Sequence, residues 1–145
     1  MFLASMLMLV VGTTSAFAET TELMGNESAS TTDFDWDPVM DAIIQVESEG
    51  NPNAKSGSSV GAMQITPICV AECNQILKRK NSKKRFKLSD RLSIAKSKEM
   101  FLLLQSVYNP LNSIERAIRA WNGGNHYNVR KTQRYFEKVM RILNR

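Results

Sequence analysis

Apolar residues recur at helical spacing along most of the chain, and capping or turn residues interrupt the pattern. In the first such stretch Val39, Ile43 and Val46 lie four and three positions apart, which predicts one buried helix face. Asp37-Pro38 is a typical helix start, since Asp is a good N-cap and Pro is favoured in the first turn. Gly50-Asn51-Pro52 is expected to end this helix.

The rest of the chain predicts a loop and four more helices. Residues 51–61 are rich in Pro, Gly, Asn and Ser and are predicted to be a loop, and residues 61–65 are expected to be extended. No internal repeat and no multi-stranded sheet is apparent in the pattern. Helices are expected over residues 66–79 after a Thr66-Pro67 start, over 89–108, over 112–122 with Asn112 and Glu115 as a capping box, and over a last stripe from Tyr135 to Leu143.

The N-terminal residues differ in composition from the rest. Residues 1–11 are almost entirely apolar and Ala16-Phe17-Ala18 has the form of a cleavage site, so residues 1–18 are predicted to be a secretory signal peptide. An uncleaved anchor is the alternative, although the run is short for a membrane span of about 20 residues. Residues 19–35 are polar and are predicted to be a flexible linker, which leaves residues 36–145 as the folded domain. Export to the periplasm or cell envelope is therefore expected.

Charge is concentrated in one stretch. Seven basic residues between positions 78 and 87 exceed the net charge of +5, so the rest of the chain is slightly acidic. Such a cluster is either a solvated loop or a contact for an anionic envelope polymer, and export argues against a nucleic-acid partner. The cluster consists of Lys78, Arg79, Lys80, Lys83, Lys84, Arg85 and Lys87.

Cysteine and histidine are too few to indicate a metal site. Cys69 and Cys73 lie four positions apart on one predicted helix face, where a disulfide is geometrically unfavourable. With His126 as the single histidine, no zinc site is expected. We interpret both cysteines as small buried hydrophobes.

Glu47 is the chemical anomaly of the first helix. It lies three and four positions after Ile44 and Ile43, beside the apolar stripe. Glu49 is turned about 200° away and is expected to face solvent. A carboxylate at the edge of a core should have a raised pKa, and an acid that keeps its proton near neutral pH can protonate a glycosidic oxygen. A helix-end carboxylate in a salt bridge is the alternative, which the spacing alone favours.

Four short motifs follow one another along the chain. They are Glu47-Ser48 with Asn51-Pro52-Asn53-Ala54, Gly61-Ala62-Met63-Gln64-Ile65-Thr66-Pro67, Ala120-Trp121-Asn122-Gly123, and Thr132 with Tyr135 and Val139. In this order they resemble the motifs of the lytic transglycosylase and goose-type lysozyme family, E-S-x-x-[ND]-P-x-A, G-x-M-Q-[IL]-x-P, A-x-N-G and T-x-x-Y-x-x-x-V. The resemblance covers about residues 38–143 and implies a mainly α, lysozyme-like single domain of about five helices with a short extended or β segment at the cleft.

The resemblance implies a role for seven residues. Glu47 corresponds to the catalytic acid/base, and Tyr135 to a tyrosine whose hydroxyl supports that carboxyl. Core packing is the alternative for Met63 and Tyr135, and capping of a turn is the alternative for Gln64. Five further residues are expected to bind substrate. They are the serine beside the acid (Ser48), the glycine and methionine of the cleft floor (Gly61 and Met63), a cleft glutamine (Gln64) and an asparagine that binds an N-acetyl sugar (Asn122).

Two positions depart from the family pattern. Trp121 stands where the family usually has Tyr, which keeps an aromatic ring but removes a hydroxyl. Ser97 stands at the glycine of a helix motif, N-I-x-x-G-x-x-Y-L, that is matched only faintly here. Both departures concern the substrate groove more than the chemistry.

The resemblance implies peptidoglycan glycan strands as substrate. Because Glu47 is the one carboxylate near the motifs, the expected function is lytic transglycosylation. In that reaction one Glu cleaves the β-1,4 bond between N-acetylmuramic acid and N-acetylglucosamine, with a 1,6-anhydro product and no metal or cofactor. A hydrolysing lysozyme is the alternative if Asp33, Asp35 or Asp41 positions water. The other alternative is a non-catalytic peptidoglycan-binding module of a secretion or conjugation apparatus.

Overall fold

The computed structural model describes residues 33–145, so the predicted signal peptide and most of the predicted linker lie outside the described residues. The described residues form one unit that is mainly helical and has a two-stranded antiparallel sheet, which confirms the expected fold class. The elements are α1 (Asp37–Ser48), β1 (Lys55–Ser56), β2 (Ser59–Val60), α2 (Pro67–Arg79), the 3-10 helix η1 (Leu88–Leu92), α3 (Ile94–Tyr108), α4 (Ile114–Gly123) and α5 (Val129–Leu143).

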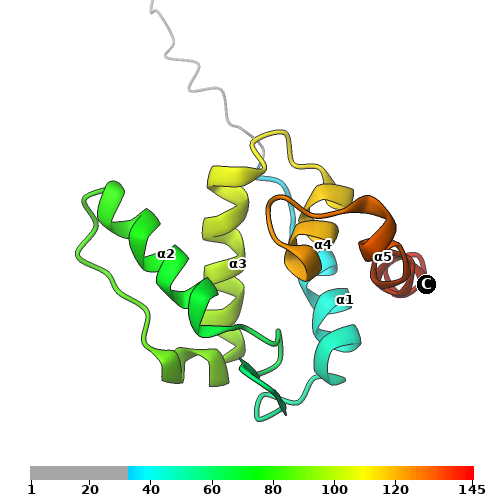
Figure 1. The fold of residues 1–145 in the computed structure, drawn as a ribbon, viewed down its shortest axis with the longest axis horizontal. Helices are drawn as coiled ribbons and strands as arrows, with labels where there is room; N and C mark the ends of the chain where they lie inside the picture. The colour runs from blue at the N-terminus through cyan, green and yellow to red at the C-terminus, as the bar shows by residue number, and fades with distance from the viewer. Residues whose placement is uncertain (1–32) are drawn as a thin grey trace, which may run out of the picture. The chain divides into compact units, whose positions relative to one another are not determined.

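Helix α3 occupies the middle of this unit. Figure 1 shows α3 between α2 on one side and α1 with α4 on the other, and α5 packs against both α1 and α4. Phe101 of α3 is fully buried, and its ring lies 5.6 Å from the ring of Trp36 and 5.3 Å from that of Trp121. The aromatic contacts therefore join the start of α1 and the end of α4 to the central helix. Within residues 33–145, no helix has the length and apolar character needed to cross a bilayer.

The helix starts follow the predictions only in part. Thr66 caps α2 as predicted, since its hydroxyl accepts a hydrogen bond from the amide of Cys69 at 3.2 Å. The predicted capping box of α4 is wrong. Ser113 is the N-cap there, and Asn112 has a left-handed backbone with φ of 53°. The side chain of Asn109 accepts a hydrogen bond from the amide of Ser113 at 3.0 Å. This bond keeps Asn112 in the loop, so the helix begins one residue later than expected.

The extended segment lies earlier in the chain than predicted. Residues 61–64 form a turn, and the strands occupy the part of the chain that was predicted to be a loop. Gly57, with φ of 58°, and Ser58 connect the strands as a two-residue hairpin. Such a connection needs turn residues, which explains why a Gly- and Ser-rich segment forms strands. Ile65 adds one bridge to Val60, with hydrogen bonds of 3.0 and 3.1 Å in both directions.

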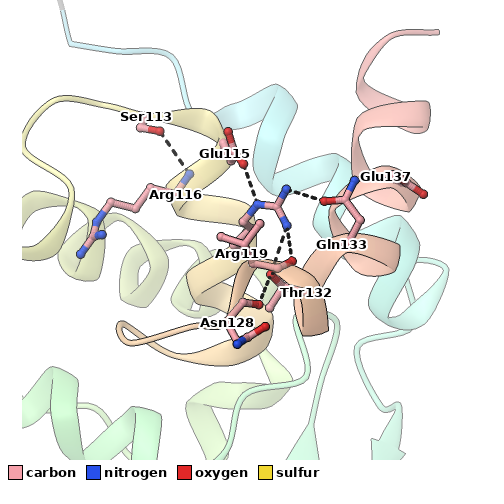
Figure 2. A network of polar contacts seen from close by, with 9 residues as sticks. Ser113, Glu115, Arg116, Arg119, Asn128, Thr132, Gln133 and Glu137 are labelled. Atoms are coloured by element: carbon pink, nitrogen blue, oxygen red, sulfur yellow. Dashed lines mark hydrogen bonds and ion pairs between the residues drawn. The ribbon is translucent and has the colours of Figure 1, made fainter.

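A buried arginine fastens α4 to α5. Arg119 is 3% exposed, and Figure 2 shows its guanidinium between the two helices. It donates to Glu115 at 2.7 Å and to Gln133 at 2.8 Å, and it lies 4.3 Å from the centre of the Phe136 ring. Further bonds go to the carbonyl of Val129 and the hydroxyl of Thr132. Because α5 carries Tyr135, this network also sets the position of a predicted site residue.

The basic cluster occupies the end of α2 and the loop that follows it. Phe86 anchors this loop in the core, and the side chain of Asn74 makes two hydrogen bonds to the Phe86 backbone, at 2.7 and 2.9 Å. All seven basic side chains are exposed. Among the described residues only Lys84 of the cluster forms an ion pair, with Glu99. The loop is therefore ordered by an apolar anchor, and its charge is turned outward.

Candidate active site

The carboxyl group of Glu47 lies half-buried on the last turn of α1. Tyr135, brought to it by α5, donates a hydrogen bond from its hydroxyl to Glu47 Oε1 at 2.8 Å. Burial raises the pKa of Glu47, and the hydrogen bond from Tyr135 opposes that rise by a smaller amount. Within residues 33–145 no Lys, Arg or His forms an ion pair with Glu47, so the salt-bridge alternative is wrong. Glu49, the C-cap of α1, is exposed as predicted.

Tyr135 is itself mostly buried. Burial raises the pKa of its hydroxyl first, and the neighbouring negative charge of Glu47 raises it further. The phenol therefore stays protonated and can donate its proton to the carboxyl group. This hydrogen bond holds the Glu47 carboxyl in one orientation.

Ser48 ties the acid-bearing helix to the turn at residues 61–64. Its hydroxyl donates to the carbonyl of Ala62 at 2.8 Å and to that of Ile44 at 3.2 Å. The residue next to the acid is thus used to hold the end of α1 against the turn. This contact fixes the end of the helix on which Glu47 lies.

Packing within the protein requires a glycine at position 61 of the turn. Gly61 has φ of 87°, and a Cβ built there would lie 1.8 Å from the carbonyl oxygen of Arg91. Ser97 of α3 also contacts this carbonyl oxygen, to which its hydroxyl donates a hydrogen bond at 3.3 Å. The close approach that was expected to serve a sugar ring is therefore made by the main chain of η1. The serine that departs from the family pattern takes part in the same packing.

Met63 and Gln64, the last two residues of the turn, differ in their surroundings. Met63 is fully buried and its side chain belongs to the core, while its carbonyl accepts from the indole of Trp121 at 3.1 Å. Gln64 has φ of 53°, and its amide nitrogen donates to the carbonyls of Gly61 and Ala54 at 2.9 and 3.2 Å. Since both partners of Gln64 are acceptors, its amide oxygen remains as an acceptor for a ligand.

A groove with a volume of about 880 Å³ opens beside this turn. Residues of α2, of α3, of α4 and of the loop after α4 line it. Gln64, Trp121 and the exposed Asn122 are among the lining residues, whereas Glu47, Ser48 and Tyr135 are not. The turn links the two sets, because Ser48 binds it from the acid side and Trp121 from the groove side. The turn at residues 61–64 therefore lies between the helix end that carries Glu47 and the groove, and hydrogen bonds hold it on both sides.

Three polar residues of the groove were not predicted to be functional. Glu72 comes from α2, Tyr108 from the end of α3, and Arg116 from α4. The hydroxyl of Tyr108 donates to Glu72, and Arg116 Nε donates to the carbonyl of Tyr108 at 2.8 Å. No short motif contains them, since they meet only through packing of three separate helices.

A small helical domain with a short hairpin, a half-buried acid and a groove beside the turn has the architecture of the lysozyme-like class. Residues 25–143 match the family model described as the transglycosylase SLT domain, and the chain belongs to that family. The resemblance noted in the motifs is thereby confirmed. Family membership supports lytic transglycosylase activity in general and peptidoglycan as the substrate. Comparisons with curated proteins and with solved structures found no match.

Proposed function

We propose that this chain is a lytic transglycosylase that cleaves the β-1,4 bond between N-acetylmuramic acid and N-acetylglucosamine with Glu47 as its single acid/base. The observation that carries the proposal is the half-buried Glu47 carboxyl, held by Tyr135 and without an ion pair within residues 33–145. A carboxyl group whose pKa is raised by burial is suited to protonate a leaving glycosidic oxygen. Ser48 ties the helix that bears this acid to the turn that contains Gly61 and Met63. Gln64 and Asn122 bind the glycan.

The proposed reaction uses the same carboxyl group twice. Glu47 first gives its proton to the glycosidic oxygen, and the bond between that oxygen and C1 of the muramic acid breaks. The substrate's acetamido group stabilises the positive charge that develops at C1. The resulting carboxylate then takes the proton from the muramyl 6-hydroxyl, whose oxygen attacks C1 and closes the 1,6-anhydro ring. The acid is regenerated and no water is consumed.

The surroundings of the other acidic side chains support a single-acid mechanism. A hydrolase that uses two carboxylates needs the second one beside the bond to be cut. Asp41 is engaged by Lys98 at 2.8 Å, and Asp35 accepts from the amide of Asp37 at 3.0 Å. Both lie at or before the first turns of α1, whereas Glu47 lies on its last turn.

Digestion of purified sacculi tests the proposed reaction. The products are separated and weighed by mass spectrometry. Transglycosylation should give fragments that end in 1,6-anhydromuramic acid, which are one water molecule lighter than hydrolysis products. Fragments with reducing ends would instead favour the lysozyme alternative.

The Tyr135→Phe variant should shift the pH profile of cleavage. Because the first step needs protonated Glu47, the rate should fall as the pH rises through the raised pKa of that group. Removing the Tyr135 hydroxyl removes the hydrogen bond that lowers this pKa, so the alkaline limb should move to higher pH. We also expect the maximal rate to fall about tenfold, because the carboxyl loses its orientation.

Tyr127→Phe is the matched control for this shift. Tyr127 is also half-buried, but its hydroxyl makes no side-chain hydrogen bond within residues 33–145. Its profile should coincide with that of the unmodified chain. A limb that moves to lower pH in Tyr135→Phe would show that the hydroxyl does not stabilise the carboxylate.

Export and the basic cluster remain parts of this proposal. Acting on peptidoglycan requires delivery to the cell envelope, and residues 1–18 are proposed to supply the signal. The six exposed cations of the cluster that lack an ion pair among the described residues are proposed to contact an anionic envelope polymer.

A further inference from the structure

The groove carries two fixed charges of opposite sign that the proposed cleavage does not use. Glu72 supplies the one carboxylate and Arg116 the one guanidinium among the residues that line it. Tyr108 connects them, since its hydroxyl donates to Glu72 and its carbonyl accepts from Arg116 Nε at 2.8 Å. Both charges are therefore held at the end of α3.

Each charge keeps binding capacity for a ligand. Within residues 33–145 neither Glu72 nor Arg116 takes part in an ion pair. The hydrogen bond from Tyr108 uses only one oxygen of Glu72, and the bond to the Tyr108 carbonyl uses only Nε of Arg116. The second carboxylate oxygen and the terminal guanidinium nitrogens remain for partners from outside the chain.

Apolar surface adjoins the carboxylate. Ile68 lies one turn before Glu72 on α2 and is 81% exposed, and Leu104 of α3 lines the same groove. An exposed isoleucine in a groove is suited to cover the methylene groups of a long side chain. The site thus offers an anion, a cation and an aliphatic surface together.

Peptidoglycan contains one component with this combination of groups. Its glycan strands carry short peptides that include carboxylates and a diamino acid whose ammonium group ends an aliphatic chain. Neutral sugar hydroxyls need neither charge. We propose that Glu72, Tyr108 and Arg116 form a binding site for the peptide stem, with the ammonium at Glu72 and a carboxylate at Arg116. This inference rests on the proposed function, because it places the stem of the same substrate.

Cleavage of two forms of one substrate tests the site. Uncrosslinked strands that carry peptides are compared with the same strands after an amidase has removed the peptides. Glu72→Gln should raise KM about fivefold for the peptide-bearing strands, as expected for one partly exposed charge pair, and should leave peptide-free strands unchanged. Arg116→Gln should act in the same direction.

Glu137→Gln is the matched control. Glu137 is exposed on α5 and does not line the groove, and a glutamine there can still accept the bond from Gln133. It should leave both substrates unaffected. An equal loss on both substrates in Glu72→Gln, or no change on either, would overturn the peptide site.

Binding of the free stem peptide separates this inference from the cleavage proposal. The peptide is titrated into the full chain and followed by NMR, and Glu72→Gln should weaken binding about fivefold. If the unmodified chain binds the peptide in a Glu72-dependent way but cuts neither substrate, the proposed function fails and the peptide site stands. Peptide binding that is the same in both proteins would overturn the site whatever the cleavage rates.

Discussion

Replacing Glu47 by Gln should lower the rate of glycan cleavage by at least about 1,000-fold, because an amide cannot transfer the proton on which both steps depend. Glutamine has the shape of the acid and can still accept the hydrogen bond from Tyr135. The loss should therefore appear in kcat, with binding of sacculi retained. Initial rates on purified sacculi, followed by release of soluble fragments, measure it.

The same variant should be at least as stable as the unmodified chain at neutral pH. The pKa of Glu47 is higher in the folded protein than in the unfolded one, so stability is lost as the pH rises between the two values. Removing the ionisable group removes that loss. A lower rate at an unchanged or raised thermal midpoint would separate a catalytic role from a structural one.

Glu49→Gln is the control, since Glu49 is an exposed carboxyl two residues further along the chain. It should cut at the normal rate. Retention of more than about a tenth of the activity in Glu47→Gln would contradict the assigned role. An unmodified chain that binds sacculi but never cuts them would favour the non-catalytic envelope module.

Gly61→Ala should be the most destabilising glycine-to-alanine change within residues 33–145. A Cβ at this position meets the carbonyl oxygen of Arg91 at 1.8 Å, and the backbone φ of 87° already disfavours any side chain. Both the turn and η1 would have to move apart. We expect a loss of roughly 3 kcal/mol or more in the free energy of unfolding, measured by chemical denaturation.

Gly50→Ala is the matched control, because Gly50 has nearly the same φ, 83°, and its Cβ would meet nothing within 4 Å. It should lose only about 1 to 2 kcal/mol, the conformational part of the effect. Equal losses in the two variants would show that the contact with Arg91 does not determine the need for glycine.

Local patterns predicted the helices well and the loops poorly. The stripe on α1 and the Thr66 cap of α2 depend on neighbours within one turn, so the sequence contains them. Ser113 displaced Asn112 as the cap of α4 because Asn109 folds back on the loop, a contact that spacing does not show. The hairpin was missed because glycine and serine suggest a loop whether or not strands flank them.

The acid of the candidate site was predictable, and its surroundings were predictable only in part. Glu47 stands beside an apolar stripe, and the family resemblance pairs it with Tyr135, a contact found at 2.8 Å. The buried Arg119 that sets α5 was not predicted, since arginines are usually exposed and its partners lie on two helices. Glu72 and Arg116 were missed for the same reason, because long-range packing alone brings them together.

Direct titration of one carboxyl group tests the central claim, which is that Glu47 holds its proton to higher pH than an ordinary glutamic acid. The side-chain carboxyl carbons are labelled with ¹³C, and Glu47 is assigned by comparison with Glu47→Gln. Its midpoint should lie above the ordinary glutamate pKa of 4.5, and it should rise further in Tyr135→Phe. A midpoint at or below 4.5 would contradict the account, since burial would then not favour the protonated form of this acid.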